Sequence, residues 1–167
     1  MVEDPVLRQR YEFIREGDVM VVEVWAEAGS HVPDHLHPAQ VERWEVVEGE
    51  ATFYVDGRGE SLGAGGRVSV EPGRRHRFEV SPSGPARLRA QVEPALDIEG
   101  FLTDGAALNG SGRYTARGIP KGLRAAIDAA AFLKRYEQTT VVLSPPRIIQ
   151  RLFVLPLARF ARSSAGL

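Results

Sequence analysis

The side chains of this chain best suited to chemistry are three histidines and one glutamate. His35 and His37 are separated by a single residue, so on a β-strand both side chains point the same way. Glu42 follows five residues after His37, and His76 lies further along the chain. Three imidazoles and a carboxylate could hold one divalent transition metal (Mn, Fe, Co, Ni, Cu or Zn), and are too rich in nitrogen to favour Mg or Ca. A plainer interpretation is that His35 and His37 are surface residues of a proline-rich loop.

The segments that must position these residues have the pattern of β-strands. From about Tyr11 to Val92, apolar and other residues alternate with a period of two, which is typical of half-buried strands. Turn signals such as Asp56-Gly57 and Pro72-Gly73 separate the segments. Many short strands with frequent turns predict a sandwich or barrel.

Aromatic residues on the same segments have two interpretations each. Trp44 is in register with Glu42, so we expect it to point inward, either as a wall of a substrate pocket or as plain barrel core. Phe53 and Phe78 have the same two interpretations, as substrate-pocket residues or as core.

Other polar residues near the histidines are expected at the surface. His31 should lie in a loop at the barrel mouth, and Arg75 and Arg77 should face outward by alternation with His76. Glu71 is either a general base or an outward-pointing carboxylate.

The pattern becomes helical after about Pro94. We expect a short helix over Leu96–Leu108, a loop over Asn109–Gly118 and an alanine-rich helix from Pro120 to Tyr136. The apolar positions of the alanine-rich helix are wider than one stripe, which indicates burial against two neighbours. The chain is therefore expected to consist of a barrel over residues 1–94 and a helical extension over residues 95–167, packed together as one structural unit.

A last helix is expected to begin at Ser144-Pro145-Pro146, where a serine cap precedes proline. Its apolar residues are predicted to cover the barrel or a sister subunit: Ile149, Phe153, Leu157 and Phe160. Because the same helix carries arginines, binding to an anionic membrane surface is the alternative.

Composition excludes several classes of function. The 167 residues are 43% hydrophobic and 26% charged with a net charge of −1, so nothing indicates the basic face of a nucleic-acid-binding protein. The absence of cysteine excludes disulfides, zinc–thiolate sites and cysteine nucleophiles. A polar N-terminus and the lack of a long apolar stretch predict neither signal peptide nor membrane span, and we expect a cytoplasmic protein.

Two motifs resemble those of the cupin superfamily. The segment Gly29-x5-His35-x-His37-x4-Glu42-x6-Gly49 matches every fixed position of the first cupin motif. The segment Gly65-x5-Glu71-Pro72-Gly73-x2-His76 resembles the second motif, although a proline normally stands at position 71 and an asparagine at position 80, where this chain has valine. The resemblance covers roughly residues 18–93 and is that of a small, single-domain cupin of the cupin 2 type.

The resemblance implies a mainly β fold, a double-stranded β-helix (a jelly-roll-like barrel) with the C-terminal helices added to it. It also implies that one divalent metal is held by His35, His37, Glu42 and His76. The glycines of the motifs, at positions 29, 49, 65 and 73, are expected to form turns that need a permissive φ.

The cupin fold does not determine the reaction. One hypothesis is a metal-dependent enzyme, a dioxygenase-like protein or an isomerase acting on a small organic substrate. The other is a non-enzymatic module that binds or senses a small molecule. We also expect a homodimer, because Trp25 alternates outward as an unpaired indole and the helices carry more apolar surface than one barrel flank needs.

Overall fold

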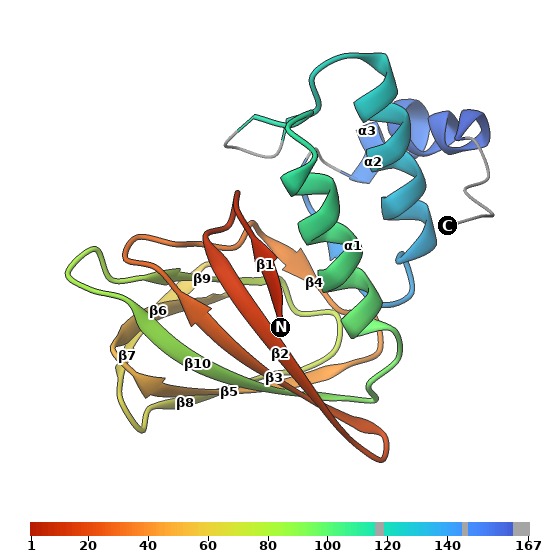
Figure 1. Cartoon of the computed structure of the whole chain (residues 1–167). Helices are drawn as coiled ribbons and strands as arrows, with labels where there is room; N and C mark the ends of the chain where they lie inside the picture. Colours follow the sequence, from red (N-terminus) through yellow and green to blue (C-terminus); the bar gives the residue numbers. More distant parts are fainter. Residues whose placement is uncertain (116–118, 145–146, 162–167) are drawn as a thin grey trace.

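Two antiparallel sheets curve around a shared core in the computed structural model of the chain, which describes residues 1–115, 119–144 and 147–161, apart from the side chains at 147 and 153 (Figure 1). In the described part of the chain, the first sheet has the order β1 (Val2–Asp4), β2 (Gln9–Glu16), β3 (Val19–Ala26), β10 (Ala86–Glu93), β5 (Val41–Glu48) and β8 (Arg67–Val70). The second has the order β11 (Val141–Val142), β4 (His35–Leu36), β9 (His76–Val80), β6 (Glu50–Val55) and β7 (Arg58–Gly63). The predicted double-stranded β-helix with C-terminal helices is confirmed.

The alternation of the sequence places the core between the sheets. In β3, Met20, Val22 and Val24 are buried, and their partners across the ladder with β10 are Val92, Ala90 and Leu88, which are buried as well. Phe53 of β6 and Phe78 of β9 belong to the same core and face each other in register. Strands with a period of two thus supply one apolar face each to a common interior.

The motif glycines serve turns, as predicted. Gly29, Gly49, Gly65 and Gly73 all have positive φ angles, between 70° and 83°. At Gly49, between β5 and β6, a Cβ atom would also lie 2.4 Å from the carbonyl oxygen of Pro85. Both the backbone angle and the close approach therefore require glycine at this turn.

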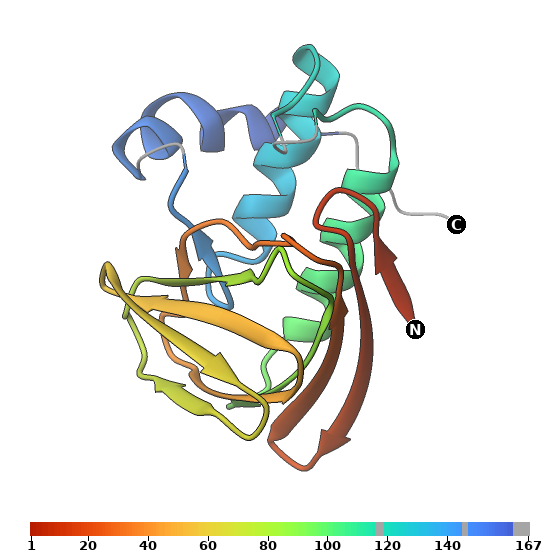
Figure 2. The same ribbon diagram turned by 90° about the vertical axis from the view of Figure 1, so that its left-hand side faces the viewer.

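The helical extension gathers at one end of the barrel in both views (Figures 1 and 2). It consists of α1 (Ile98–Gly110), α2 (Leu123–Arg135), α3 (Arg147–Ile149), the π-helical turn η1 (Gln150–Val154) and the 3₁₀ helix η2 (Leu155–Phe160). α1 packs on β1, and α2 lies between α1 and η2, which confirms the two neighbours expected for the alanine-rich helix. That barrel and extension form one structural unit stays a prediction.

The helix boundaries differ from the predicted ones by a few residues. α1 begins at Ile98 rather than Leu96, because Leu96 has a φ of 43°, which a right-handed helix does not accept. α1 also continues to Gly110, into the loop expected from Asn109, while residues 116–118 of that loop lie outside the described residues. α2 begins at Leu123, after Gly122 with its φ of 89°.

The last helical segment was predicted to cover the barrel or a sister subunit; cover of a sister subunit stays a prediction. η2 packs on α2, and Ile149 and Phe160 remain 42% and 57% exposed. Pro145, Pro146 and the side chain of Phe153, which belonged to that prediction, lie outside the described residues. Among the described residues, no helix combines the length and apolarity needed to cross a membrane.

The outer face of β3 is held by ion pairs. Glu23 is only 4% exposed and accepts hydrogen bonds from the guanidinium groups of Arg87 and Arg89 on β10. The Arg87 guanidinium also lies over the Trp25 ring, 5.4 Å from its centroid. Trp25 is therefore not an unpaired indole, so one reason for expecting a homodimer is removed, and the dimer itself stays a prediction.

If the chain is a twofold dimer, light scattering at micromolar concentration should give a mass near twice 18.3 kDa. Trp25→Glu should return the mass to that of one chain if the outer face of β3 is the interface, because a buried carboxylate without a partner is costly. Ile119→Glu, in the exposed part of the helical extension, distinguishes an interface made by the helices. A wild-type mass near 18.3 kDa would reject the dimer.

Candidate metal centre

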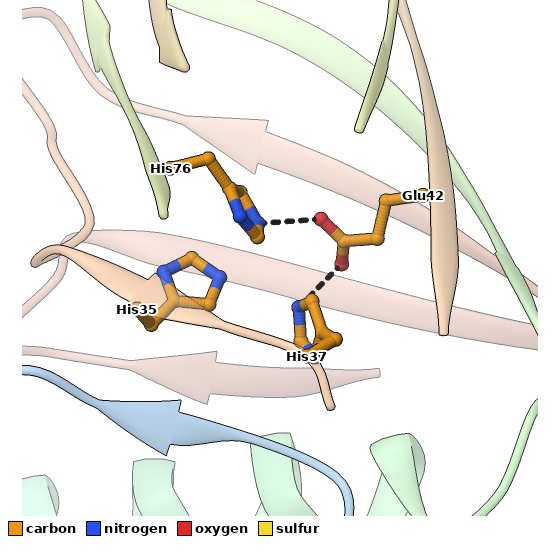
Figure 3. Close-up of side chains that lie close together, drawn as sticks. All are labelled: His35, His37, Glu42 and His76. Carbon is orange, nitrogen blue, oxygen red and sulfur yellow. Dashed lines mark hydrogen bonds and ion pairs between the residues drawn. The ribbon is translucent and has the colours of Figure 1, made fainter. Parts of the chain in front are cut away.

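The predicted ligand residues come together inside the barrel. They lie on, or directly after, the strands β4, β5 and β9. His35 lies on β4 and is paired with His76 on β9, His37 follows β4, and Glu42 lies on β5 in the opposite sheet. Each residue offers one nitrogen or oxygen atom such that all four atoms lie within 4.8 Å of one another (Figure 3). The convergence expected from the sequence is present, and the cluster could hold a metal ion.

Each histidine is oriented by a hydrogen bond from its Nδ1 atom to a backbone carbonyl. His35 Nδ1 lies 2.9 Å from the oxygen of Pro33, His76 Nδ1 lies 3.0 Å from that of Arg74, and His37 Nδ1 lies 2.8 Å from that of Thr139. A carbonyl oxygen only accepts hydrogen bonds, so Nδ1 carries the hydrogen in all three rings. In the neutral ring the lone pair is then on Nε2, as metal coordination requires.

Glu42 is the anionic centre of the cluster. Its Oε1 lies 3.0 Å from His37 Nε2, and its Oε2 lies 2.9 Å from His76 Nε2 (Figure 3). The indole Nε1–H of Trp44 donates a hydrogen bond to Oε2 over 3.0 Å. Glu42, His37 and His76 are 3–5% exposed, so water contributes little to compensating the negative charge.

The protonation states follow from these contacts. Burial opposes charge on both His37 and Glu42. The attraction and hydrogen bonding between the two side chains outweigh the effect of burial on each of them. The pKa of His37 is raised, and the pKa of Glu42 is well below its usual range. Burial, and then repulsion by His76 and His37, lowers the pKa of His35 to about 3, so the His35 imidazole is neutral at physiological pH.

The donor set fits a first-row transition metal. Such ions bind imidazole nitrogen and carboxylate oxygen at about 2.0–2.2 Å, so adjacent ligand atoms at a right angle lie roughly 3 Å apart. The separations of 3.0 and 2.9 Å between Glu42 and the two histidines have this value. The buried Nε2 of His37 has the Glu42 carboxylate as its polar neighbour, so a metal bound between the two would contact both.

Exposure indicates from which side the cluster is reached. His35 is half-buried, whereas the other three residues of the cluster are buried. A small molecule would therefore approach the cluster beside His35.

The three aromatic residues named for a substrate pocket lie together next to the cluster. The ring centroids of Trp44, Phe53 and Phe78 are 5.3–5.7 Å apart. Phe53 and Phe78 are 4% and 3% exposed, and Trp44 is half-buried. Their role as a pocket wall stays a prediction. Trp44 also orients Glu42 through its indole hydrogen bond, a contact that the sequence did not predict.

The remaining polar residues lie outside the cluster. His31 and Glu71 are exposed, and Arg75 is paired with Asp34 at the surface. The Arg77 guanidinium lies over the Tyr54 ring, 3.7 Å from its centroid. The outward direction expected for the two arginines agrees with these contacts.

The residues that sequence reasoning missed altogether are Thr139 and Thr140. The carbonyl of Thr139 accepts from His37, and the Thr140 hydroxyl lies 3.3 Å from the same Nδ1 atom. A backbone carbonyl occurs at every residue and 102 positions separate the partners, so no sequence signal could have found this contact.

Comparison with known proteins agrees with the fold and the cluster. Residues 21–98 match the protein family described as "Cupin domain". The barrel is a cupin. No curated protein matches the chain. Among solved structures, the chain resembles an RmlC-like cupin from Shewanella frigidimarina, with 26% identity, a TM-score of 0.54 and coverage of 59% of this chain and 87% of the other.

It also resembles KdgF from Halomonas sp., with 17% identity, a TM-score of 0.55 and coverage of 59% of this chain and 90% of the other. Both similarities cover little more than half of this chain, which corresponds to the extent of a barrel without the helical extension. They establish the cupin fold and leave the reaction open.

Replacing one ligand should abolish metal binding without unfolding the cupin barrel. We expect His37→Ala to weaken Zn²⁺ binding by at least about 100-fold, since loss of an outer-sphere partner alone costs 10–100-fold. Isothermal titration measures the affinity, and far-UV circular dichroism checks the fold. His31→Ala is the matched control, because His31 is exposed and lies outside the cluster, and it should bind as the wild type does. Equal affinity in His37→Ala and the wild type would contradict the assignment of His37.

Metal affinity should also depend on pH. Histidine ligands bind metal in the neutral form, and the pKa of His37 is raised beside Glu42, so protons compete with the metal at His37 as the pH falls. We expect affinity for Zn²⁺ to fall progressively as the pH is lowered from 8 through the ordinary histidine pKa of about 6.5, and to be weak below about pH 6. Titration at each pH, with circular dichroism to confirm a folded barrel, measures this, and an affinity that is constant down to pH 5 would be inconsistent with histidine ligands.

Proposed function

We propose that this cupin is a metal-dependent enzyme that acts on a small organic substrate, with oxygenase chemistry as the leading reaction class. The observation that carries the proposal is the orientation of all three histidines by carbonyl acceptors, which directs three Nε2 atoms and one carboxylate at the same point. Preorganisation of this kind is typical of functional metal sites, where partners of the ligands set tautomer and ring direction.

In this proposal His35, His37, Glu42 and His76 hold one divalent first-row metal. The bound metal would supply Lewis-acid or redox chemistry, with the positions not taken by protein open to substrate or dioxygen. The half-buried face of His35 is the side on which these positions would be reached.

The residues around the metal have different roles in the proposed function. Glu42 supplies the only negative charge of the cluster, and the Trp44 indole keeps that carboxylate in place. Trp44, Phe53 and Phe78 form an apolar wall behind the cluster, which excludes water and strengthens the electrostatic interactions within it.

A non-enzymatic module that binds or senses a small molecule is the second candidate. The same four residues of the cluster support it, because a metal held by them could bind a ligand without reaction. In this case the metal would hold a ligand and no reaction would follow.

The two candidates differ in whether the metal keeps an exchangeable position. We expect protein purified without a nickel column to contain close to one metal per chain, by elemental analysis. After loading with ferrous iron under argon, nitric oxide, a stand-in for dioxygen, should give an iron–nitrosyl signal in electron paramagnetic resonance. Bound iron without a nitrosyl signal would reject the oxygenase and favour the binding module, and a chain that binds no metal would reject both.

If the signal appears, a dioxygen electrode and a panel of small aromatic and enolic substrates test for turnover. Glu42→Gln is the matched variant, because it keeps the shape of the side chain and removes its charge. We expect it to lower iron content and dioxygen consumption together. Copurified zinc in place of iron or copper would direct the screen towards isomerase and hydrolytic reactions instead.

A further inference from the structure

The segment after α2 returns from the helical extension to the barrel and joins the sheet that carries two residues of the metal centre. Val141 and Val142 of β11 pair with Leu36 and His35 of β4. The backbone N–H of Leu143 donates to the carbonyl of Asp34 over 2.9 Å. β11 is thus an additional strand beside β4, on the side away from β9.

This segment supplies the contacts that orient His37. The Thr139 carbonyl accepts a hydrogen bond from His37 Nδ1 over 2.8 Å, and the Thr140 hydroxyl oxygen lies 3.3 Å from the same nitrogen. Thr139, Thr140 and His37 are 2–4% exposed, so water does not replace these contacts. His35 and His76 differ in this respect, because their carbonyl acceptors lie only two residues upstream, in the loop just before each strand.

The segment is itself held by the helices. The backbone N–H groups of Thr139 and Thr140 both donate to the carbonyl of Tyr136, just after α2. The Tyr136 hydroxyl donates to Asp104 of α1 over 2.7 Å. At the other end of the segment, the Gln150 side chain donates to the carbonyl of Val142 over 2.7 Å.

We propose that residues 139–143 are a positioning clamp on His37, through which docking of the helical extension and metal binding in the barrel are coupled. The inference rests on the proposed metal site. The clamp fixes the His37 ring in the tautomer whose lone pair is on Nε2, the atom that lies 3.0 Å from Glu42. Without it, the ring would lose its Nδ1 acceptors and populate the other tautomer or rotate.

The coupling is reciprocal. If a docked clamp raises the affinity for metal by some factor, bound metal must raise the stability of the docked clamp by the same factor. The helical extension is therefore part of the site rather than an appendage, and a metal-dependent signal would reach α1 and α2 through Tyr136.

The first test uses the Thr140 hydroxyl. Thr140→Val keeps the shape of the side chain and removes one of the two acceptors of His37, so we expect about a tenfold loss in Zn²⁺ affinity. Thr140→Ser should restore affinity to near the wild-type value. Thr52→Val is the matched control, because Thr52 lies on β6, away from the cluster, and valine suits a strand.

Nitrogen NMR of the metal-free protein, recorded at an alkaline pH where the His37 ring is neutral, reads the tautomer directly, which a merely structural role would not change. We expect His37 to carry its hydrogen on Nδ1 in the wild type and in Thr52→Val, and to show a mixture in Thr140→Val. Wild-type affinity together with an unchanged tautomer in Thr140→Val would overturn the inference, whereas absence of Zn²⁺ binding by the wild type would overturn the metal site itself.

The second test uses hydrogen exchange on the wild-type chain. Saturation with Zn²⁺ should slow exchange of the Leu143 amide, which donates to Asp34 at the edge of the barrel. The Glu27 amide, which donates to the carbonyl of Arg8 in the barrel, outside the clamp, the cluster and the helices, is the control and should not change. Exchange at Leu143 that is the same with and without bound Zn²⁺ would overturn the coupling.

Discussion

Compensation of the buried Glu42 carboxylate is the interaction on which the rest of this cupin depends. Moving an ionised carboxylate out of water is costly unless hydrogen bonds and opposite charge replace its hydration. Here the Trp44 indole donates over 3.0 Å, and the Nε2 atoms of His37 and His76 lie 3.0 and 2.9 Å away, where a proton or a shared cation joins them to the carboxylate. These groups come from three places in the chain, so the two sheets must close into a barrel before the charge is compensated. A divalent cation would add the positive charge that such a site favours.

The orientation of the histidines depends on backbone carbonyls rather than on further charged groups. His35 and His76 use the carbonyls of Pro33 and Arg74 within their own segments, so the local chain sets their direction. His37 uses Thr139 from the helical extension. In addition, the backbone N–H of Gly73 donates to the carbonyl of His37 over 2.8 Å, which ties the turn of the second motif to the first. The cluster is thus positioned by contacts to parts of the chain that lie outside it.

On the outer face of β3, apolar surface is covered by charged side chains rather than by other apolar residues. Buried Glu23 between Arg87 and Arg89, with Arg87 over Trp25, covers apolar surface by long side chains whose charged ends stay near water. Alternation alone predicted Trp25 outward correctly but could not show which neighbour would lie over it. Ile149 and Phe160 belong to an apolar stripe, yet they are exposed in the structure. Such a stripe predicts a buried face but does not show which element, if any, covers it.

The sequence by itself determined the strands, the turn glycines and the composition of the metal cluster. Those features depend on local spacing: His35 and His37 two apart, glycine where φ is positive, and apolar residues at every second position. Only the tertiary structure decided the tautomers of the histidines, the hydrogen bond from Trp44 to Glu42 and the contact between Thr139 and His37. These depend on which carbonyl or indole comes within 3 Å after folding, and a backbone carbonyl has no signature in the sequence because every residue carries one.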